Sequence, residues 1–314
     1  MSDGPRVVLI TGASSGIGAA TALLAAERGD HVVLLARGAA ALDQMADRCA
    51  SLGAASTRTL PTDVRDDAAV RDAVEAAVAE HGRLDLVVGS AGVVAYGRLE
   101  DVPAEVFDAV LETNLHGSVN LARHVLPHLR AQNAGSFVLV GSLIGHISVP
   151  GMSAYVLSKW GVHALARQLR AENRDRPGIN FGYVAPGGVD TPIYEQAANY
   201  GDAVGRPPFP VATPEQVARR VLAVADRPFL RSQVGAANDV IRFGFTAFPW
   251  VYDALVGPLF RVFAQDLTQP VEPGPGNVLS SHEEANAVRG GWGNALVNVA
   301  RNLAVVGRGR GGSG

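Results

Sequence analysis

Tyr155 and Lys159 are four residues apart, and Ser142 lies thirteen residues before Tyr155. Four residues make about one helical turn, so the phenol and the ammonium share a helix face. Because a nearby cation favours phenolate over phenol, we expect Lys159 to lower the pKa of Tyr155. Ser142 follows the apolar run 136–140 and would bring a hydroxyl from a different element. An acid–base group beside a hydroxyl is suited to proton exchange with a carbonyl or alcohol oxygen.

A tyrosine and a lysine at this spacing also occur by chance on an exposed helix face, where the lysine reaches into solvent. The beginning of the chain argues against that alternative. The apolar run 6–10 predicts a buried strand, and the alanine-rich stretch 19–28 predicts a helix that Gly29 ends. Between them lies the glycine turn, Thr11 to Gly18, with a Gly-x-x-x-Gly-x-Gly pattern.

The glycine turn is suited to binding a dinucleotide. Its glycines let the backbone approach a pyrophosphate, and the start of the next helix offers unpaired N–H groups and a partial positive charge. Two serines would add hydroxyls near the phosphates. The predicted cofactor-binding residues of this turn are Gly12, Ser14, Ser15, Gly16, Ile17 and Gly18.

Arg37 follows the second predicted strand, 31–36, where NAD-binding proteins often carry a carboxylate for the ribose hydroxyls. The nearest acid is Asp43, inside the next predicted helix. An arginine suits a 2′-phosphate, so this pattern favours NADP(H) over NAD(H). The alternative is a solvated loop arginine.

Several motifs, in this order and at this spacing, resemble those of the short-chain dehydrogenase/reductase family over residues 5–236. They are the glycine turn, Asp63 after the third strand, Asn114 in a central helix, Ser142, Tyr155 with Lys159, and the run Pro186 to Thr191. The resemblance implies a Rossmann-like, doubly wound parallel sheet of about seven strands with helices on both faces.

The resemblance also implies roles for individual residues. Tyr155 would be the general acid/base, Lys159 would hold the nicotinamide ribose, Ser142 would hydrogen-bond the substrate oxygen, and Asn114 would hold a water in a proton relay. Asp63 and Val64 would contact the adenine. The residues expected along the nicotinamide are Pro186, Gly187, Val189 and Thr191.

The chain departs from the family where the fourth strand usually ends in Asn-Asn-Ala-Gly, because it has Gly89-Ser90-Ala91-Gly92. Ser90 replaces one side-chain hydrogen bond at most, and Gly89 supplies none. We still expect Ser90, Ala91 and Gly92 to line the cofactor site. The departure bears on the adenosine side of the site more than on the catalytic step.

The composition, 47% hydrophobic and 18% charged over 314 residues, allows one large core. Apolar runs alternate with helical stretches, which predicts an α/β fold with a parallel sheet; the runs are 6–11, 31–36, 84–89, 136–141 and 179–184. A net charge of −3 and the lack of a basic run with aromatics argue against nucleic acid. One cysteine, no metal-ligand spacing and no signal-peptide pattern indicate a metal-free cytoplasmic protein.

The substrate side is predicted at a lid over residues 192–212, rich in glycine and proline. The substrate-pocket residues that we expect are Leu143, His146, Met152 and Tyr194, with Val94, Tyr96 and Ile147 beside them. His146 is interpreted as a polar residue on the pocket rim. A mostly apolar pocket favours a lipophilic ketone, aldehyde or secondary alcohol.

Beyond the predicted domain, 1–236, the sequence predicts an aromatic-rich extension, 237–268, and a Pro/Gly-rich tail, 269–314. The aromatic stretch 241–263 would cap the pocket, form an oligomer interface or lie on a membrane surface, and the first two are favoured. Within the tail we expect a linker at 269–277, a short helix at 296–306 and a disordered end from 307 to 314.

The leading hypothesis is an NADP(H)-dependent oxidoreductase that interconverts a carbonyl and an alcohol on a small molecule. An alternative is a non-catalytic NADP(H)-binding scaffold or redox sensor, and another is a peripheral membrane enzyme acting on lipids. The family resemblance implies a homodimer or homotetramer.

Overall fold

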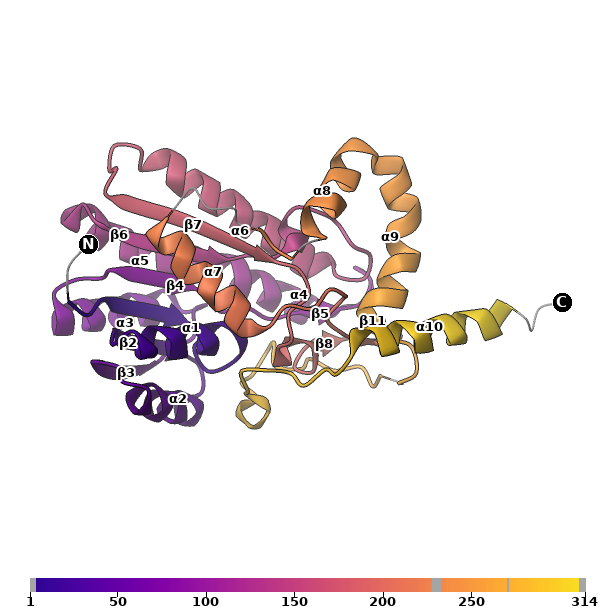
Figure 1. Ribbon diagram of the computed structural model, residues 1–314, viewed down its shortest axis with the longest axis horizontal. Helices are drawn as coiled ribbons and strands as arrows, with labels where there is room; N and C mark the ends of the chain where they lie inside the picture. The colour runs from indigo at the N-terminus through magenta and orange to yellow at the C-terminus, as the bar shows by residue number, and fades with distance from the viewer. Residues whose placement is uncertain (1–3, 228–232, 236, 270, 311–314) are drawn as a thin grey trace.

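The computed structural model describes residues 4–227, 233–235, 237–269 and 271–310. Within these residues, seven strands form one parallel sheet in the order β10, β7, β6, β4, β1, β2, β3 (Figure 1). The strands are β1 (Val7–Thr11), β2 (His31–Ala36), β3 (Ser56–Pro61), β4 (Leu86–Gly89), β6 (Gly135–Val140), β7 (Ile179–Pro186) and β10 (Gln233–Val234). This arrangement confirms the predicted doubly wound α/β fold.

Helices cover both faces of the sheet. Alternate residues of each strand point to opposite sides, and on both sides these residues are apolar and pack against helices. Val8 and Ile10 of β1 pack into a core with α1 (Gly16–Glu27), α2 (Ala39–Ser51) and α7 (Pro214–Asp226). Val7 and Leu9 pack into a second core under α3 (Asp67–His81), α5 (Gly117–Gln132) and α6 (Ser153–Glu172). Near-continuous apolar strands therefore reflect burial on both faces.

Two short ladders attach the predicted lid, residues 192–212, to the rest of the molecule. β5 (Ala95–Tyr96) pairs with β8 (Ala198–Asn199), and β9 (Val204–Gly205) pairs with β11 (Gln265–Asp266). α4 (Ala104–Leu111) packs on α6 beside the first ladder. Residues 198–205 are thereby tied both to the sheet domain and to the extension.

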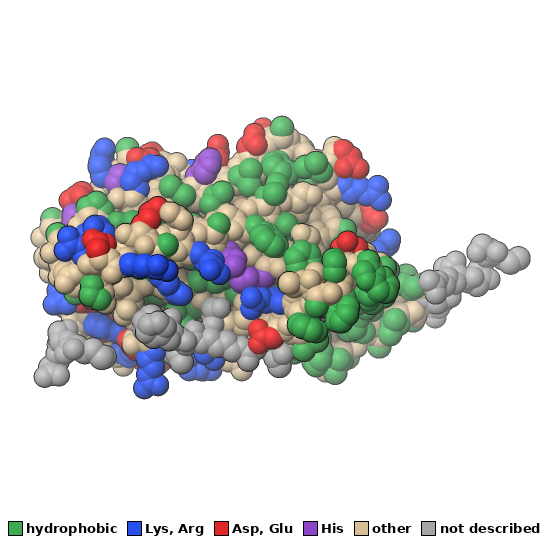
Figure 2. Space-filling view, turned by 90° about the horizontal axis from the view of Figure 1, so that it is seen from above, with side chains coloured by type: hydrophobic (Ala, Val, Ile, Leu, Met, Phe, Trp, Pro, Cys, Tyr) green, Lys and Arg blue, Asp and Glu red, His purple; other side chains and the backbone are tan. Residues whose placement is uncertain are grey.

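The predicted aromatic extension forms two helices, α8 (Asn238–Ala247) and α9 (Pro249–Ala264), which stand beside α6 at one end of the molecule (Figure 1). Phe243, Phe248 and Trp250 are exposed. Figure 2 shows hydrophobic side chains gathered at the end that carries the extension. Among the described residues, no helix has the length and apolar character needed to span a membrane.

The C-terminal tail packs against the body more closely than a linker would. Val278 is fully buried, and Gly274 pairs with Asn199 through backbone hydrogen bonds. α10 (Ala295–Arg310) is longer than the predicted helix, so the expectation of disorder is wrong for residues 307–310, which are helical. Asn302 of α10 donates hydrogen bonds to the Val262 and Gln265 carbonyls at the end of α9. The expected boundary at residue 236 and the last part of the expected disordered end, 311–314, fall outside the described residues.

Candidate active site

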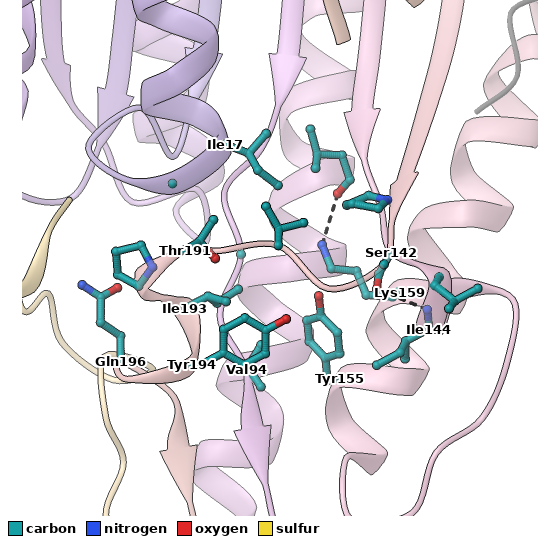
Figure 3. A pocket seen from close by; sticks show the side chains of 18 of the residues that line it. Ile17, Val94, Ser142, Ile144, Tyr155, Lys159, Thr191, Ile193, Tyr194 and Gln196 are labelled. Atoms are coloured by element: carbon teal, nitrogen blue, oxygen red, sulfur yellow. Dashed lines mark hydrogen bonds between the residues drawn. The ribbon is translucent and has the colours of Figure 1, made fainter. Parts of the chain in front are cut away.

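Tyr155 and Lys159 lie one turn apart on α6, as their spacing predicts, and both are almost completely buried. The Lys159 Nζ is 5.6 Å from the centre of the Tyr155 ring. It donates a hydrogen bond of 3.2 Å to the Val140 carbonyl at the end of β6. In Figure 3 the side chains of Tyr155, Lys159 and Ser142 approach one another from α6 and the end of β6.

Ser142 lies two residues after the end of β6, and its hydroxyl accepts a hydrogen bond of 3.2 Å from the Ile144 N–H. Burial raises the pKa of Tyr155 to about 12, and a hydrogen bond with Ser142 opposes part of that rise. The expected lowering of the Tyr155 pKa by Lys159 is therefore not seen. Burial of the phenolate outweighs the favourable neighbours, so the tyrosine is a protonated phenol at neutral pH.

Lys159 is the only lysine among the 27 lysine and arginine residues of the chain. Burial lowers its pKa to about 8. A guanidinium would remain charged in the same surroundings, because arginine does not lose its proton in proteins. The chain thus places its single lysine, a compact and titratable cation, beside the buried ring of Tyr155.

Asn114 lies in a π-helical turn, Glu112–His116, between α4 and α5. Its amide accepts from the Val93 N–H at 2.8 Å and donates to the Val93 carbonyl and the Ser158 hydroxyl, each at 2.9 Å. These contacts use the side chain to tie the segment after β4 to α6. Asn114 does not line the cavity that contains Tyr155.

Two glycines of the glycine turn are required by close packing within the chain. A Cβ at Gly12 would lie 2.8 Å from the backbone of Ala91, and a Cβ at Gly18 would lie 2.2 Å from the Gly12 carbonyl oxygen. The Thr11 hydroxyl accepts hydrogen bonds from the N–H groups of Ser90 and Ala91, at 3.1 and 3.2 Å. The altered sequence after β4 is therefore held in place by Thr11 without the family's two amides.

A cavity of about 210 Å³ joins the glycine turn to Tyr155. The predicted residues that line it are Gly12, Ser15, Gly16, Ile17, Ser90, Gly92, Val94, Tyr96, Ser142, Leu143, Met152, Tyr155, Lys159, Pro186, Gly187, Val189, Thr191 and Tyr194. Further lining residues come from the predicted lid (Gln196 and Arg206), from the aromatic stretch that was expected to cap the pocket (Phe260), and from Ala264 and Asn277, which the sequence did not indicate. They share no local motif, and only the packing of the lid and extension brings them together.

His146 is a correction to the expected substrate pocket. It lines neither described cavity, and its ring lies 4.0 Å from the ring of His163 and 5.7 Å from that of Tyr183. Burial, together with the neighbouring charges of His163 and Arg242, lowers the pKa of His146 to about 4. The short helix Leu143–Gly145 turns the chain after Ser142, so the histidine packs behind the site.

A second cavity of about 80 Å³ continues from the first toward the ends of β2 and β3. Its predicted residues are Ser14, Arg37, Asp63, Val64, Ala91 and Gly92. Burial raises the pKa of Asp63, but hydrogen bonds from Arg65 and the charges of Arg65 and Arg37 leave it below its usual value. The Arg37 side chain donates to the Asn277 carbonyl at 2.8 Å, so it is not the solvated loop arginine of the alternative.

The protein-family comparison matches the short chain dehydrogenase model to residues 6–200. The uncharacterized oxidoreductase YxnA of Bacillus subtilis is 30% identical over 273 residues, which is 85% of this chain and 76% of that protein. A 3-oxoacyl-acyl-carrier-protein reductase of Thermotoga maritima is 34% identical over 224 residues, covering 70% of this chain and 90% of its own.

A solved short chain dehydrogenase from Mycobacterium paratuberculosis, bound to NAD, superimposes with a TM-score of 0.64 and 26% sequence identity. The match covers 73% of this chain and 94% of that one. The motifs, the sheet and these relatives agree on one assignment. The chain belongs to the short-chain dehydrogenase/reductase family and is an NAD(P)-dependent oxidoreductase acting on CH–OH donors.

Proposed function

We propose that the protein interconverts a carbonyl and a secondary alcohol, or an aldehyde and an alcohol, on a lipophilic small molecule, with NADP(H) as cofactor. The observation that carries this proposal is the convergence of Tyr155, Ser142 and Lys159 on a cavity that runs to the glycine turn. A proton donor, a second hydroxyl and a cation thus surround one hollow where a substrate oxygen would lie.

The bound cofactor would supply or accept the hydride at the substrate carbon. In the direction of reduction, Tyr155 would give its proton to the substrate oxygen, and a pKa of about 12 keeps that proton in place at neutral pH. Ser142 would donate a hydrogen bond to the same oxygen. Lys159 would hold the nicotinamide ribose and stabilise the phenolate left on Tyr155.

The proton on Tyr155 would be replaced through the region of Asn114, which we assign as a positioning residue for a water relay. Its amide is engaged by Val93 and Ser158, and its backbone carbonyl accepts from the Ser118 hydroxyl at 2.7 Å. The π-helical turn around Asn114 supports this role, since such turns recur at functional sites.

The remaining cofactor contacts are assigned by the two cavities. The glycine turn, with Gly12 through Gly18, would hold the pyrophosphate. The cavity beside Arg37, Asp63 and Val64 would hold the adenosine, and residues 186–191 would line the nicotinamide. Arg37 has five N–H donors in all, so its two bonds to the tail leave capacity for a 2′-phosphate.

The substrate is proposed to be lipophilic because the wall opposite the glycine turn is mainly apolar. It is built from Val94, Leu143, Ile144, Met152, Ile193 and Phe260. The one arginine there, Arg206, is paired with Asp266 at 2.8 Å and stacks near Trp292. Because Asp266 neutralises the charge of Arg206, this arginine does not require an anionic substrate.

Cofactor preference is tested by fluorescence titration with NADPH and NADH. We expect tighter binding of NADPH, and Arg37→Ala should weaken NADPH by roughly 10- to 100-fold, the range for a hydrogen bond to a charged group. The same change should affect NADH much less. Arg58→Ala, which removes an arginine of β3 that pairs with Glu80 and lines neither cavity, is the matched control. Equal losses for both cofactors would refute the NADP(H) assignment.

We also propose that the protein works as a homodimer or homotetramer in the cytoplasm. The exposed apolar residues of α8 and α9 supply a face for a second copy, and the single, buried cysteine suits a reducing compartment. Light scattering after gel filtration measures the assembly, and a monomer would contradict this proposal. Flotation with lipid vesicles would instead support the peripheral membrane alternative.

A further inference from the structure

The C-terminal segment crosses the predicted nucleotide site on its way to α10. It begins at the predicted lid, where the Asn277 N–H donates to the Gln196 carbonyl. It returns to the residue before the lid, where the Trp292 indole N–H donates to the Thr191 carbonyl at 3.0 Å. In Figure 1 the yellow segment between these points reaches from below β8 toward α2. The two ends of this segment are therefore fixed near the lid, at Gln196 and Thr191, while its middle extends toward α2.

The two ends are anchored more firmly than the middle. Val278 is fully buried in a core cluster with residues of α4 and β5. Trp292 packs its ring against Tyr194 and receives the guanidinium of Arg206 at 5.3 Å. Between them, the short helix Glu283–Ala285 has no buried residue. We call the loop between these ends, residues 280–291, the clasp. It is held by single contacts, which include an ion pair of 3.1 Å from Arg289 to Glu215 of α7 and the packing of Val288 against the core beneath α1.

The clasp touches the elements that bind a dinucleotide at two places. The Ala287 carbonyl accepts a hydrogen bond of 2.9 Å from the Gly16 N–H, at the start of α1. The Glu283 carboxylate accepts one of 3.0 Å from the Ala41 N–H, in the first turn of α2. An N–H group at the start of α1 is a donor suited to a phosphate oxygen, so the Ala287 carbonyl competes with a pyrophosphate for it.

The clasp also leaves space beneath it. The second cavity has Arg37, Asp63 and Val64 on one side, and Ser281, His282 and Asn286 on the other. The Asn286 amide is held by the Gln196 side chain at 3.1 Å. The clasp thus adds polar groups as a roof over the adenosine half of the site, instead of filling it.

We propose that residues 280–291 are part of the dinucleotide site, as a clasp that closes over the adenosine of the cofactor and opens at Gly16 and Ala41 for exchange. This inference rests on the proposed function. Entry of the cofactor breaks the bond from Gly16 to Ala287, and reclosure brings Ser281, His282 and Asn286 against the adenosine. The clasp therefore controls the rates at which NADP(H) enters and leaves, separately from the chemical step.

The test is a reversible lock. A Cβ at Gly38 would lie 2.6 Å from the Glu283 Cγ, so the two Cβ atoms are no more than about 4 Å apart, which is close enough for a disulfide. The double variant Gly38→Cys, Glu283→Cys is compared in its oxidised and reduced forms, and mass spectrometry follows the bond. Cys49 does not interfere, since it is buried and burial raises its pKa to about 11.

Stopped-flow fluorescence with NADPH gives the association and dissociation rates. We expect both rates to fall by more than about 100-fold in the oxidised form and to recover on reduction. The single variants Gly38→Cys and Glu283→Cys, oxidised in the same way, control for the substitutions. Glu283→Ala should release NADPH about tenfold faster than the wild type, because one charge-assisted hydrogen bond that holds the clasp is lost.

Equal rates of NADPH association and dissociation in the oxidised and reduced forms would overturn the proposal that the clasp controls cofactor exchange. An unchanged rate of NADPH release in Glu283→Ala would also overturn it. Failure of the two cysteines to join would contradict the placement of Glu283 beside Gly38. If the wild type bound neither NADPH nor NADH, the proposed function would fail first, and the clasp with it. Binding by the wild type with unaltered exchange in the locked form overturns the clasp alone.

Discussion

Replacing Lys159 by methionine should make the folded protein more stable while abolishing turnover. The ammonium is almost completely buried, and burial lowers its pKa from 10.5 to about 8. A shift of this size means that holding the charge in the folded state costs about 3 kcal/mol at pH 7. Methionine has a similar length and no charge to desolvate.

The change also removes the hydrogen bond from Lys159 to the Val140 carbonyl, which is worth about 1 kcal/mol. The net gain in the free energy of unfolding is therefore about 2 kcal/mol at pH 7. For a chain of this size it raises the melting temperature by about 4 °C. Activity should be lost because the cation beside Tyr155 is gone.

The sign of the pH dependence is fixed by the direction of the pKa shift. The folded state binds the Lys159 proton more weakly than the unfolded state, so the cost of the charge is complete below pH 8 and disappears as the pH rises toward 10.5. At pH 9.5 the cost falls to about 1 kcal/mol, close to the value of the lost hydrogen bond. The advantage of the variant should then nearly vanish.

Urea unfolding of the wild type and Lys159→Met at pH 7 and pH 9.5, without cofactor, measures both effects. Because Lys159 is the only lysine of the chain, NMR of protein labelled at lysine gives its pKa directly from one side-chain signal. A variant less stable than the wild type at pH 7, or a lysine that titrates near 10.5, would refute the reasoning.

Other substitutions test the surrounding parts. Gly18→Ala, whose Cβ would lie 2.2 Å from a carbonyl of the glycine turn, should weaken cofactor binding more than tenfold in a titration, whereas Gly244→Ala, with open space around it, should not. Asn114→Ala leaves the buried N–H and carbonyl of Val93 without their partner and should lower the free energy of unfolding by about 2 to 4 kcal/mol in urea melts. Alcohol oxidation needs the Tyr155 phenolate, and the raised pKa of Tyr155 keeps it protonated, so the rate of oxidation should increase from pH 7 to 10. Carbonyl reduction needs the protonated phenol, so Tyr155 should cause no loss of the reduction rate below pH 8. Oxidation that is flat or falls over this range would contradict that assignment.

The parts of the fold that were predictable are those encoded by neighbouring residues. β-branched runs such as Val7 to Ile10 predict buried strands, and the glycine turn after them predicts the strand-to-helix connection. Tyr155 and Lys159 meet because four residues span one helical turn. The spacing of neighbouring residues was therefore enough to predict the strands of the sheet and the pairing of Tyr155 with Lys159.

The remainder depends on contacts between residues far apart in the sequence. Arg37 and Asn277 are 240 residues apart, and no local pattern links an arginine after β2 to a carbonyl of the tail. The direction of the Tyr155 pKa shift depends on how deeply the ring is buried, which spacing does not give. His146 shows the same limit, since a single turn after Ser142 directs it behind the pocket.

Single-turnover oxidation of NADPH by the wild type and by Tyr155→Phe, with a lipophilic carbonyl compound that the wild type reduces, tests the central claim most directly. Removing one hydroxyl deletes the proton donor and leaves the ring in its cavity. The account predicts that Tyr155→Phe binds NADPH like the wild type but shows no burst of NADPH oxidation. A burst of normal rate in Tyr155→Phe would contradict the assignment of Tyr155 as the general acid/base.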